Sequence, residues 1–279
     1  MENEQKTIRQ TGGIKKMWIL FAIFMGLFLV NFLGIRLDEN ATASAWTLLV
    51  FCVIISSIVM LIKNKLPNKK QIGISLVLGV LVLIAGFGVN MSIHFGMLPM
   101  AIVTTLCASA MFSIFNRYPD NAMKLLKSNS VKSVVISIVI GIAVGVVLGV
   151  VNLFLSGEEL NLTITPSAFI VALNPGVFEE LALRAFIYAF CLYLMRGEIT
   201  SKAQNFTLWF MMIVPHVLIH TPDVFIYDGI LAGMQSAVFL TVLFGFPFAF
   251  LQRKVDITSA MIAHGVVIAI RFSFLGIPM

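Results

Sequence analysis

Residues 133–155 have the sequence SVVISIVIGIAVGVVLGVVNLFL, a run without a single charged side chain. A helix needs about 20 apolar residues to cross the hydrocarbon core of a bilayer, so this run is long enough to span it. Gly141, Gly145 and Gly149 recur within it at four-residue spacing. Residues at this spacing share a helix face, and small residues there let a second backbone approach closely. The stretch therefore predicts a membrane helix with one packing face.

The rest of the chain has the same apolar character. Of its 279 residues, 59% are hydrophobic and 11% are charged, and the mean hydropathy is +0.99. A soluble domain of this length could not cover so much apolar side chain with so few charges. We predict an all-α, polytopic helical membrane protein with about nine transmembrane helices. The predicted spans are residues 17–35, 43–62, 72–91, 97–115, 133–155, 167–195, 204–221, 230–251 and 257–275.

The net charge of +6 is distributed in a way that predicts membrane topology. Basic residues gather before the first span and after every second span; they are Lys6, Arg9, Lys15, Lys16, Lys63, Lys65, Lys69, Lys70, Arg117, Lys124, Lys127, Lys132, Arg196, Lys202, Arg253 and Lys254. The opposite connections carry Arg36 against Asp38, Glu39, Glu158, Glu159, Asp223 and Asp228. Lys and Arg favour cytoplasmic loops, so we expect the N-terminus inside and the C-terminus outside. Because topology accounts for the charge, we expect the bilayer as a partner and no nucleic acid.

The longest inner connection, residues 116–132, divides the predicted spans. We assign residues 1–115 to an N-terminal accessory bundle of four helices and residues 131–279 to a core of five helices. All of the apolar segments that contain candidate site residues follow this connection.

Glu179, Glu180 and Arg184 interrupt the apolar span 167–195, in the sequence NPGVFEELALRAF at residues 174–186. A charge at mid-bilayer costs at least about 3 kcal/mol, so such groups usually pair and face a protein interior or a wet cavity. Glu180 and Arg184 are four residues apart and share a helix face, whereas Glu179 lies about 100° away around the helix. Arg184 can thus neutralise one carboxylate while the other remains available for catalysis. A purely structural ion-pair cluster is the alternative.

Three of the four histidines also lie in apolar surroundings. His216 and His220 are four apart in WFMMIVPHVLIH, residues 209–220, and His264 lies in SAMIAHGVVIAI, residues 259–270. We expect His220, near the outer end of its span, to be interfacial. At 1.5 Å per residue, His216 lies roughly 16 Å and His264 roughly 10 Å from the inner end of its span. If the outer end of span 167–195 is anchored near Ser167, Glu179 lies about 12 Å from the inner boundary of the hydrocarbon core. A carboxylate and an imidazole at one depth can deprotonate a water, and a second imidazole can stabilise an oxyanion.

These motifs resemble those of the CAAX-protease and bacteriocin-processing (CPBP, or Abi) family of intramembrane glutamic proteases. EELALR has the family's Glu-Glu-x-x-x-Arg form, and His216 and His264 follow in the family's order over residues 131–279. The resemblance implies a metal-independent endopeptidase that acts on a membrane-associated peptide or protein. It implies that Glu179 and His216 activate water, that His264 stabilises the oxyanion, and that Glu180 and Arg184 support the site. The sequence departs from the family at Met212, where Phe is usual, and at Ile268, where Asn or Asp is usual.

Other functions compete with the protease. Ile268 favours a catalytically inactive membrane scaffold or a bacteriocin-immunity or regulatory protein. In an active protease, His220 would be the nearest candidate in sequence to replace the donor lost at Ile268. A proton-coupled transporter also uses buried carboxylates and histidines, but no paired inverted repeats are detectable. A zinc hydrolase could use Glu179, His216 and His264 as ligands, although the chain has no HExxH motif. Because no eukaryotic sorting signal is evident, we expect a bacterial plasma membrane.

Overall fold

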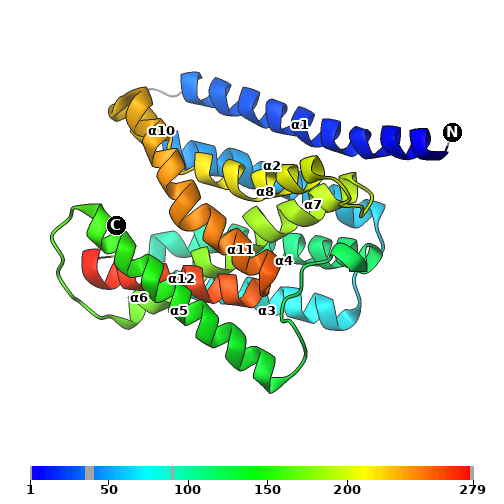
Figure 1. Ribbon diagram of the computed structural model, residues 1–279. Coiled ribbons are helices and arrows are strands. Elements are labelled where there is room, and N and C mark those ends of the chain that lie inside the picture. The colour runs from blue at the N-terminus through cyan, green and yellow to red at the C-terminus, as the bar shows by residue number, and fades with distance from the viewer. Residues whose placement is uncertain (1, 35–40, 89–90, 277–279) are drawn as a thin grey trace. The chain divides into compact units, whose positions relative to one another are not determined.

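The structure is a computed structural model, and it describes residues 2–34, 41–88 and 91–276 (Figure 1). Every regular element within these ranges is a helix, so the all-α prediction is confirmed for them. Arg36, Asp38 and Glu39 lie outside the described residues, as do positions 35 and 89–90 of the predicted spans.

Seven helical stretches within these ranges are long and apolar enough, by length and composition, to cross a membrane. They are Gly13–Val30, Ala41–Lys63, Lys69–Gly88, Gly96–Arg117, Val131–Ser156, Gly229–Lys254 and Ile257–Leu275. Each overlaps one predicted span. The prediction of a polytopic helical membrane protein therefore agrees with the structure.

The other two predicted spans are helical but not single long helices. Span 167–195 is divided into α6 (Pro166–Val171), η3 (Asn174–Glu179), η4 (Leu181–Ala185) and α7 (Phe186–Leu194), of which η3 and η4 are π-helical. Span 204–221 corresponds to α8 (Lys202–Leu218), which has 17 residues. A helix of that length measures about 26 Å, less than the roughly 30 Å of a hydrocarbon core.

Contacts between residues divide the chain into two compact units. Unit 1 comprises Met1–Leu66, Ala110–Ala122 and Phe186–Phe246, and unit 2 comprises Pro67–Ser109, Met123–Ala185 and Pro247–Met279. Each unit draws on both early and late parts of the chain. The division into an accessory bundle and a core at residues 116–132 stays a prediction.

In unit 1, α1 (Glu2–Gly34) packs against α2 (Ala41–Lys63), α7 and α8. The Trp18 indole N–H donates to Thr207 Oγ1 over 3.3 Å, and this bond joins α1 to α8. At the start of α9 (Pro222–Tyr227), the Asp223 carboxylate accepts from the backbone N–H groups of Ala41 and Thr42 at 3.1 and 3.3 Å. The first N–H groups of a helix have no partner within it, so Asp223 caps α2. α10 (Gly229–Leu240) and η5 (Thr241–Gly245) also belong to unit 1.

In unit 2, α5 (Val131–Ser156) packs along α12 (Ile257–Leu275). A Cβ atom added at Gly141 would lie 2.7 Å from the Ile262 side chain, and one at Gly145 would lie 2.7 Å from the Ala263 carbonyl oxygen. Real Cβ contacts are not this short, so only glycine permits the approach. The predicted packing face is confirmed, and its partner is α12. The other main helices of unit 2 are α3 (Lys69–Ala85) and most of α4 (Met91–Arg117) and α11 (Phe246–Lys254).

The buried Asp256 fixes the start of α12. Its carboxylate accepts from the Ser259 backbone N–H at 2.8 Å, from the Ser137 hydroxyl at 2.5 Å and from the Lys127 backbone N–H at 3.3 Å. Asp256 is thus both the N-cap of α12 and its link to α5. His264 lies about two turns further along α12, so these hydrogen bonds fix the position of its imidazole along the helix axis.

We predict that Gly145→Leu destabilises the protein by about 1–3 kcal/mol, because the new side chain would press on the backbone of α12. Thermal unfolding in detergent measures the effect. The matched control is Val147→Leu on the exposed face of the same helix, where 61% of the side chain is accessible. Equal stability of the two variants would contradict the close packing of α5 on α12.

Candidate active site

The predicted carboxylates lie where the helix departs from α geometry. Pro175 has no backbone N–H, so α-helical hydrogen bonding cannot continue through it, and π-helical turns of this kind recur at functional sites. At Gly176, an added Cβ would lie 2.9 Å from the Met261 carbonyl oxygen and 3.2 Å from Gly265 Cα. The absence of a side chain there lets η3 lie against α12, next to His264.

The Glu180 carboxylate is the centre of a buried polar cluster. Arg184 Nη1 donates to Oε1, which confirms the predicted pairing. The same oxygen lies 2.8 Å from His264 Nδ1, and Oε2 accepts from the Gln252 amide at 2.7 Å. Gln252 also donates to the Glu180 backbone carbonyl at 2.9 Å. We call Glu180, Arg184, Gln252 and His264 the Glu180 cluster.

Burial determines the chemistry of this cluster. Glu180 is 0% exposed and Arg184 is 1% exposed, so neither charge is solvated by bulk water. Such a pair is tolerated only when the remaining hydrogen-bonding positions are filled, and His264 and Gln252 fill positions on the carboxylate. An ionised carboxylate only accepts hydrogen bonds. Nδ1 of His264 therefore carries a proton, and Nε2 is the nitrogen on the far side of the ring.

Glu179 lies beside that second nitrogen. Its Oε2 is 3.8 Å from His264 Nε2, and both residues are buried, with 8% of each exposed. This separation exceeds that of a direct hydrogen bond but suits two groups that contact the same water. The adjacent glutamates thus have different surroundings: Glu180 binds Arg184 and Gln252, and Glu179 faces the outer nitrogen of His264.

Phe248 holds the His264 ring from one face. The two rings stack with centroids 4.6 Å apart and planes 19° apart, and the Arg184 guanidinium lies 5.6 Å from the Phe248 centroid. Phe248 and Gln252 are four residues apart in α11, so both side chains point toward the Glu180 cluster. Neither residue is among the site residues predicted from the sequence. Gln252 directly precedes Arg253 and Lys254, so it looked like part of the cytoplasmic boundary, and only its spacing from Phe248 could have revealed its role.

His216 and His220 lie in unit 1. His216 is buried near the end of α8, whereas His220 follows that helix in a turn and is exposed, as an interfacial residue would be. Their ring centroids are 5.3 Å apart, and Trp46 of α2 meets both edge-on, at 6.0 Å from His216 and 4.9 Å from His220. Glu179 belongs to unit 2, so its predicted meeting with these histidines stays a prediction.

The arrangement of unit 2 gives little support to a metal site at Glu180. Its carboxylate is bound by a guanidinium cation, which would repel a metal ion at the same oxygens. Glu179 and the outer nitrogen of His264 are the atoms of unit 2 that fit the zinc alternative, which also requires His216.

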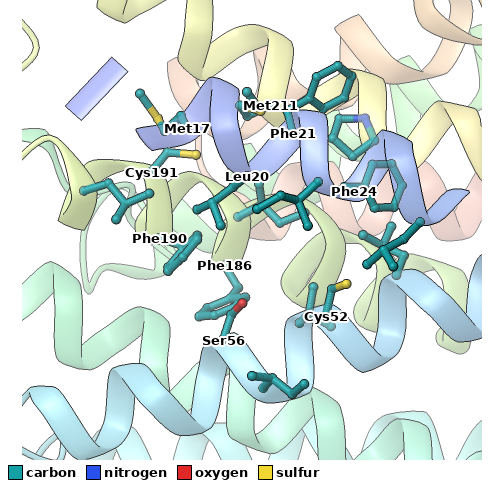
Figure 2. A pocket seen from close by; sticks show the side chains of 18 residues that line it. Met17, Leu20, Phe21, Phe24, Cys52, Ser56, Phe186, Phe190, Cys191 and Met211 are labelled. Atoms are coloured by element: carbon teal, nitrogen blue, oxygen red, sulfur yellow. The ribbon is translucent and has the colours of Figure 1, made fainter. Parts of the chain in front are cut away.

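Each unit contains an apolar cavity. In unit 1, a cavity of about 260 Å³ is lined by α1, α2, α7 and α8, with Cys52, Cys191 and Ser56 among its walls (Figure 2). These cysteines are free thiols, and the cavity contains none of the predicted site residues. In unit 2, a cavity of about 410 Å³ is lined by Gly176 and Val177 of η3 and by Met261 and Gly265 of α12, among other apolar residues. The segments that carry Glu179 and His264 therefore also form an apolar wall.

Comparison with known proteins adds no relative. No family model matches the chain, and neither a curated protein nor a solved structure matches it. The resemblance to CPBP proteases therefore stays a prediction that depends on residues 179–184, His216 and His264.

We predict that Arg184→Met destabilises the protein by about 3–5 kcal/mol, because it leaves the Glu180 charge buried without its cation. The control is Arg271→Met, which breaks the partly exposed Arg271–Glu158 pair at 3.8 Å and should change stability by less than about 1 kcal/mol. Thermal unfolding in detergent compares the two. Similar losses in both variants would contradict the central place of the Glu180–Arg184 pair.

Proposed function

We propose that this chain is an intramembrane endopeptidase that hydrolyses a peptide bond in a membrane-associated peptide or protein. The observation that carries the proposal is the pair of adjacent buried glutamates with different surroundings. Arg184, Gln252 and His264 bind Glu180, which suits a supporting role. Glu179 faces His264 Nε2 across 3.8 Å, which suits a base that activates water beside an imidazole able to bind the developing oxyanion.

In the proposed reaction, Glu179 removes a proton from water while the water oxygen bonds to the carbonyl carbon. The carbonyl electron pair moves to its oxygen. His264, in its doubly protonated imidazolium form with Nδ1–H bound to Glu180, donates a hydrogen bond from Nε2–H to the resulting oxyanion. When the intermediate collapses, the C–N bond breaks and the proton held by Glu179 passes to the leaving amine. One water is consumed and Glu179 is regenerated. On sequence grounds, we assign His216 to the water together with Glu179.

The surroundings of the site support an apolar substrate. The cavity of unit 2 shares η3 and α12 with Glu179 and His264, and its lining residues have apolar side chains or are glycines. An apolar segment of a membrane peptide could rest there without leaving polar groups unpaired. We further propose nine membrane crossings with the N-terminus inside and the C-terminus outside, in a bacterial plasma membrane.

We predict that Glu179→Gln and His216→Gln each lower peptide cleavage by about 10²–10⁴-fold, the range that general acid–base groups contribute. Purified protein in lipid nanodiscs is incubated with a pool of synthetic transmembrane peptides, and products are identified by mass spectrometry. Addition of EDTA should leave cleavage unchanged, whereas a zinc enzyme would lose it. Wild-type turnover by Glu179→Gln would exclude the assigned base.

An inactive scaffold or immunity protein is the second candidate, and Ile268 is the observation that favours it. This residue is half-buried in α12, one turn after His264, and its side chain has no donor for an oxyanion. One such donor is worth about 10²–10³-fold in rate.

We predict that Ile268→Asn raises turnover in the same peptide assay by up to about 100-fold, because it adds a donor beside the proposed oxyanion. Ile268→Leu is the control and should leave the rate unchanged. Absence of cleavage by both wild type and Ile268→Asn would favour the scaffold.

A further inference from the structure

Gln252 is the member of the Glu180 cluster to which the proposed reaction gives no role. The side chain is 2% exposed and reaches from α11 to Glu180 of the π-helical segment. It is not part of the family resemblance, and the mechanism proposed above gives it no role. Its two hydrogen bonds nevertheless go to the residue that holds both Arg184 and His264.

The orientation of this amide follows from its partners. Glu180 offers only acceptors, a carboxylate oxygen at 2.7 Å and a carbonyl oxygen at 2.9 Å, so the NH₂ group must face them. The amide oxygen Oε1 then points away and, among the described residues, has no hydrogen-bond partner. A buried acceptor without a donor is costly. Gln252 keeps this orientation because the reverse would place three acceptors against one another.

The two bonds hold different parts of Glu180. Glu180 lies between the π-helical segments η3 and η4, where the backbone hydrogen-bond register departs from that of an α-helix. Gln252 donates to the Glu180 carbonyl oxygen there and, with the same nitrogen, to a carboxylate oxygen, so it fixes the carboxylate rotamer. It does so without adding a charge, whereas Lys or Arg at this place would add a second cation beside Arg184.

Because the Glu180 carboxylate is held in place, it also holds the His264 imidazole that is bonded to it. Glu180 Oε1 lies 2.8 Å from His264 Nδ1, and Phe248, one turn before Gln252, stacks on the ring at 4.6 Å. With one edge and one face of the ring held, Nε2 can point in one direction only, toward Glu179 Oε2 at 3.8 Å. Displacing the carboxylate would turn Nε2 away from the place where both groups meet a water.

We propose that Gln252 is a positioning residue that sets Glu180 so that His264 presents Nε2 to Glu179. Its effect on catalysis rests on the proposed peptidase function, whereas its effect on the imidazole does not. Gln252 acts through Glu180 and His264 and does not touch the substrate.

The test is ¹⁵N NMR of histidine-labelled protein in lipid nanodiscs, where loss of one signal in His264→Gln assigns His264. In wild type we expect a protonated Nδ1 with a low-field proton, the signature of its bond to a carboxylate. Gln252→Met has similar volume but no donor, and should lose or shift this signal and lower kcat roughly 10- to 100-fold at unchanged KM, as expected for a misplaced catalytic group. Gln235→Met, on the exposed face of α10, is the matched control and should change neither.

If Gln252→Met does not fold, Gln252→Asn keeps the amide but is one methylene too short to reach Glu180, and should show the same loss. A wild-type His264 signal in either folded variant, or an unprotonated Nδ1 in wild type, would overturn the proposal. If wild type cleaves no peptide but the His264 signal still responds to Gln252→Met, the peptidase function fails and the positioning role stands.

Discussion

A carboxylate taken out of water must be given both a counter-charge and hydrogen-bond donors, and the arrangement around Glu180 follows from this requirement. Arg184 supplies the counter-charge from the next turn of the same segment, and His264 and Gln252 supply donors from α12 and α11. If any one of these donors is removed, the buried charge of Glu180 is stabilised by fewer groups. The π-helical segment, α11 and α12, which are distant in the chain, are therefore held together at Glu180 by electrostatic interactions as well as by packing.

Helix packing makes this convergence geometrically possible. The glycines of α5 let α12 lie close along its length, and Gly176 lets the π-helical segment reach the same helix. Asp256 then fixes where α12 begins, through bonds to Ser259, Ser137 and Lys127. Small residues set the distance between backbones, and a buried carboxylate at the helix start sets the register. With both fixed, His264 meets Glu180 at hydrogen-bonding distance.

The sequence predicted the parts of this arrangement that depend on local spacing. The glycine repeat of α5 and the pairing of Glu180 with Arg184 both follow from residues four positions apart. The partners of α11 could not be predicted, because Phe248 lies in an apolar run and Gln252 stands next to basic residues at a helix end. Nor did composition reveal that span 167–195 is divided, since π-helical turns depend on which tertiary donors are available.

The same cluster gives two chemically identical residues different surroundings. Glu180 is bound by Arg184 and Gln252, and Glu179 lies against the outer nitrogen of His264. The proposed glutamate base and its supporting residue require this asymmetry. A structure of the protein in a lipid nanodisc, determined by cryo-electron microscopy at side-chain resolution, tests it most directly. We expect the nitrogens of His264 and Gln252 each within about 3.2 Å of a Glu180 carboxylate oxygen. Density that places Glu180 toward lipid, or either nitrogen beyond hydrogen-bonding distance, would contradict this account.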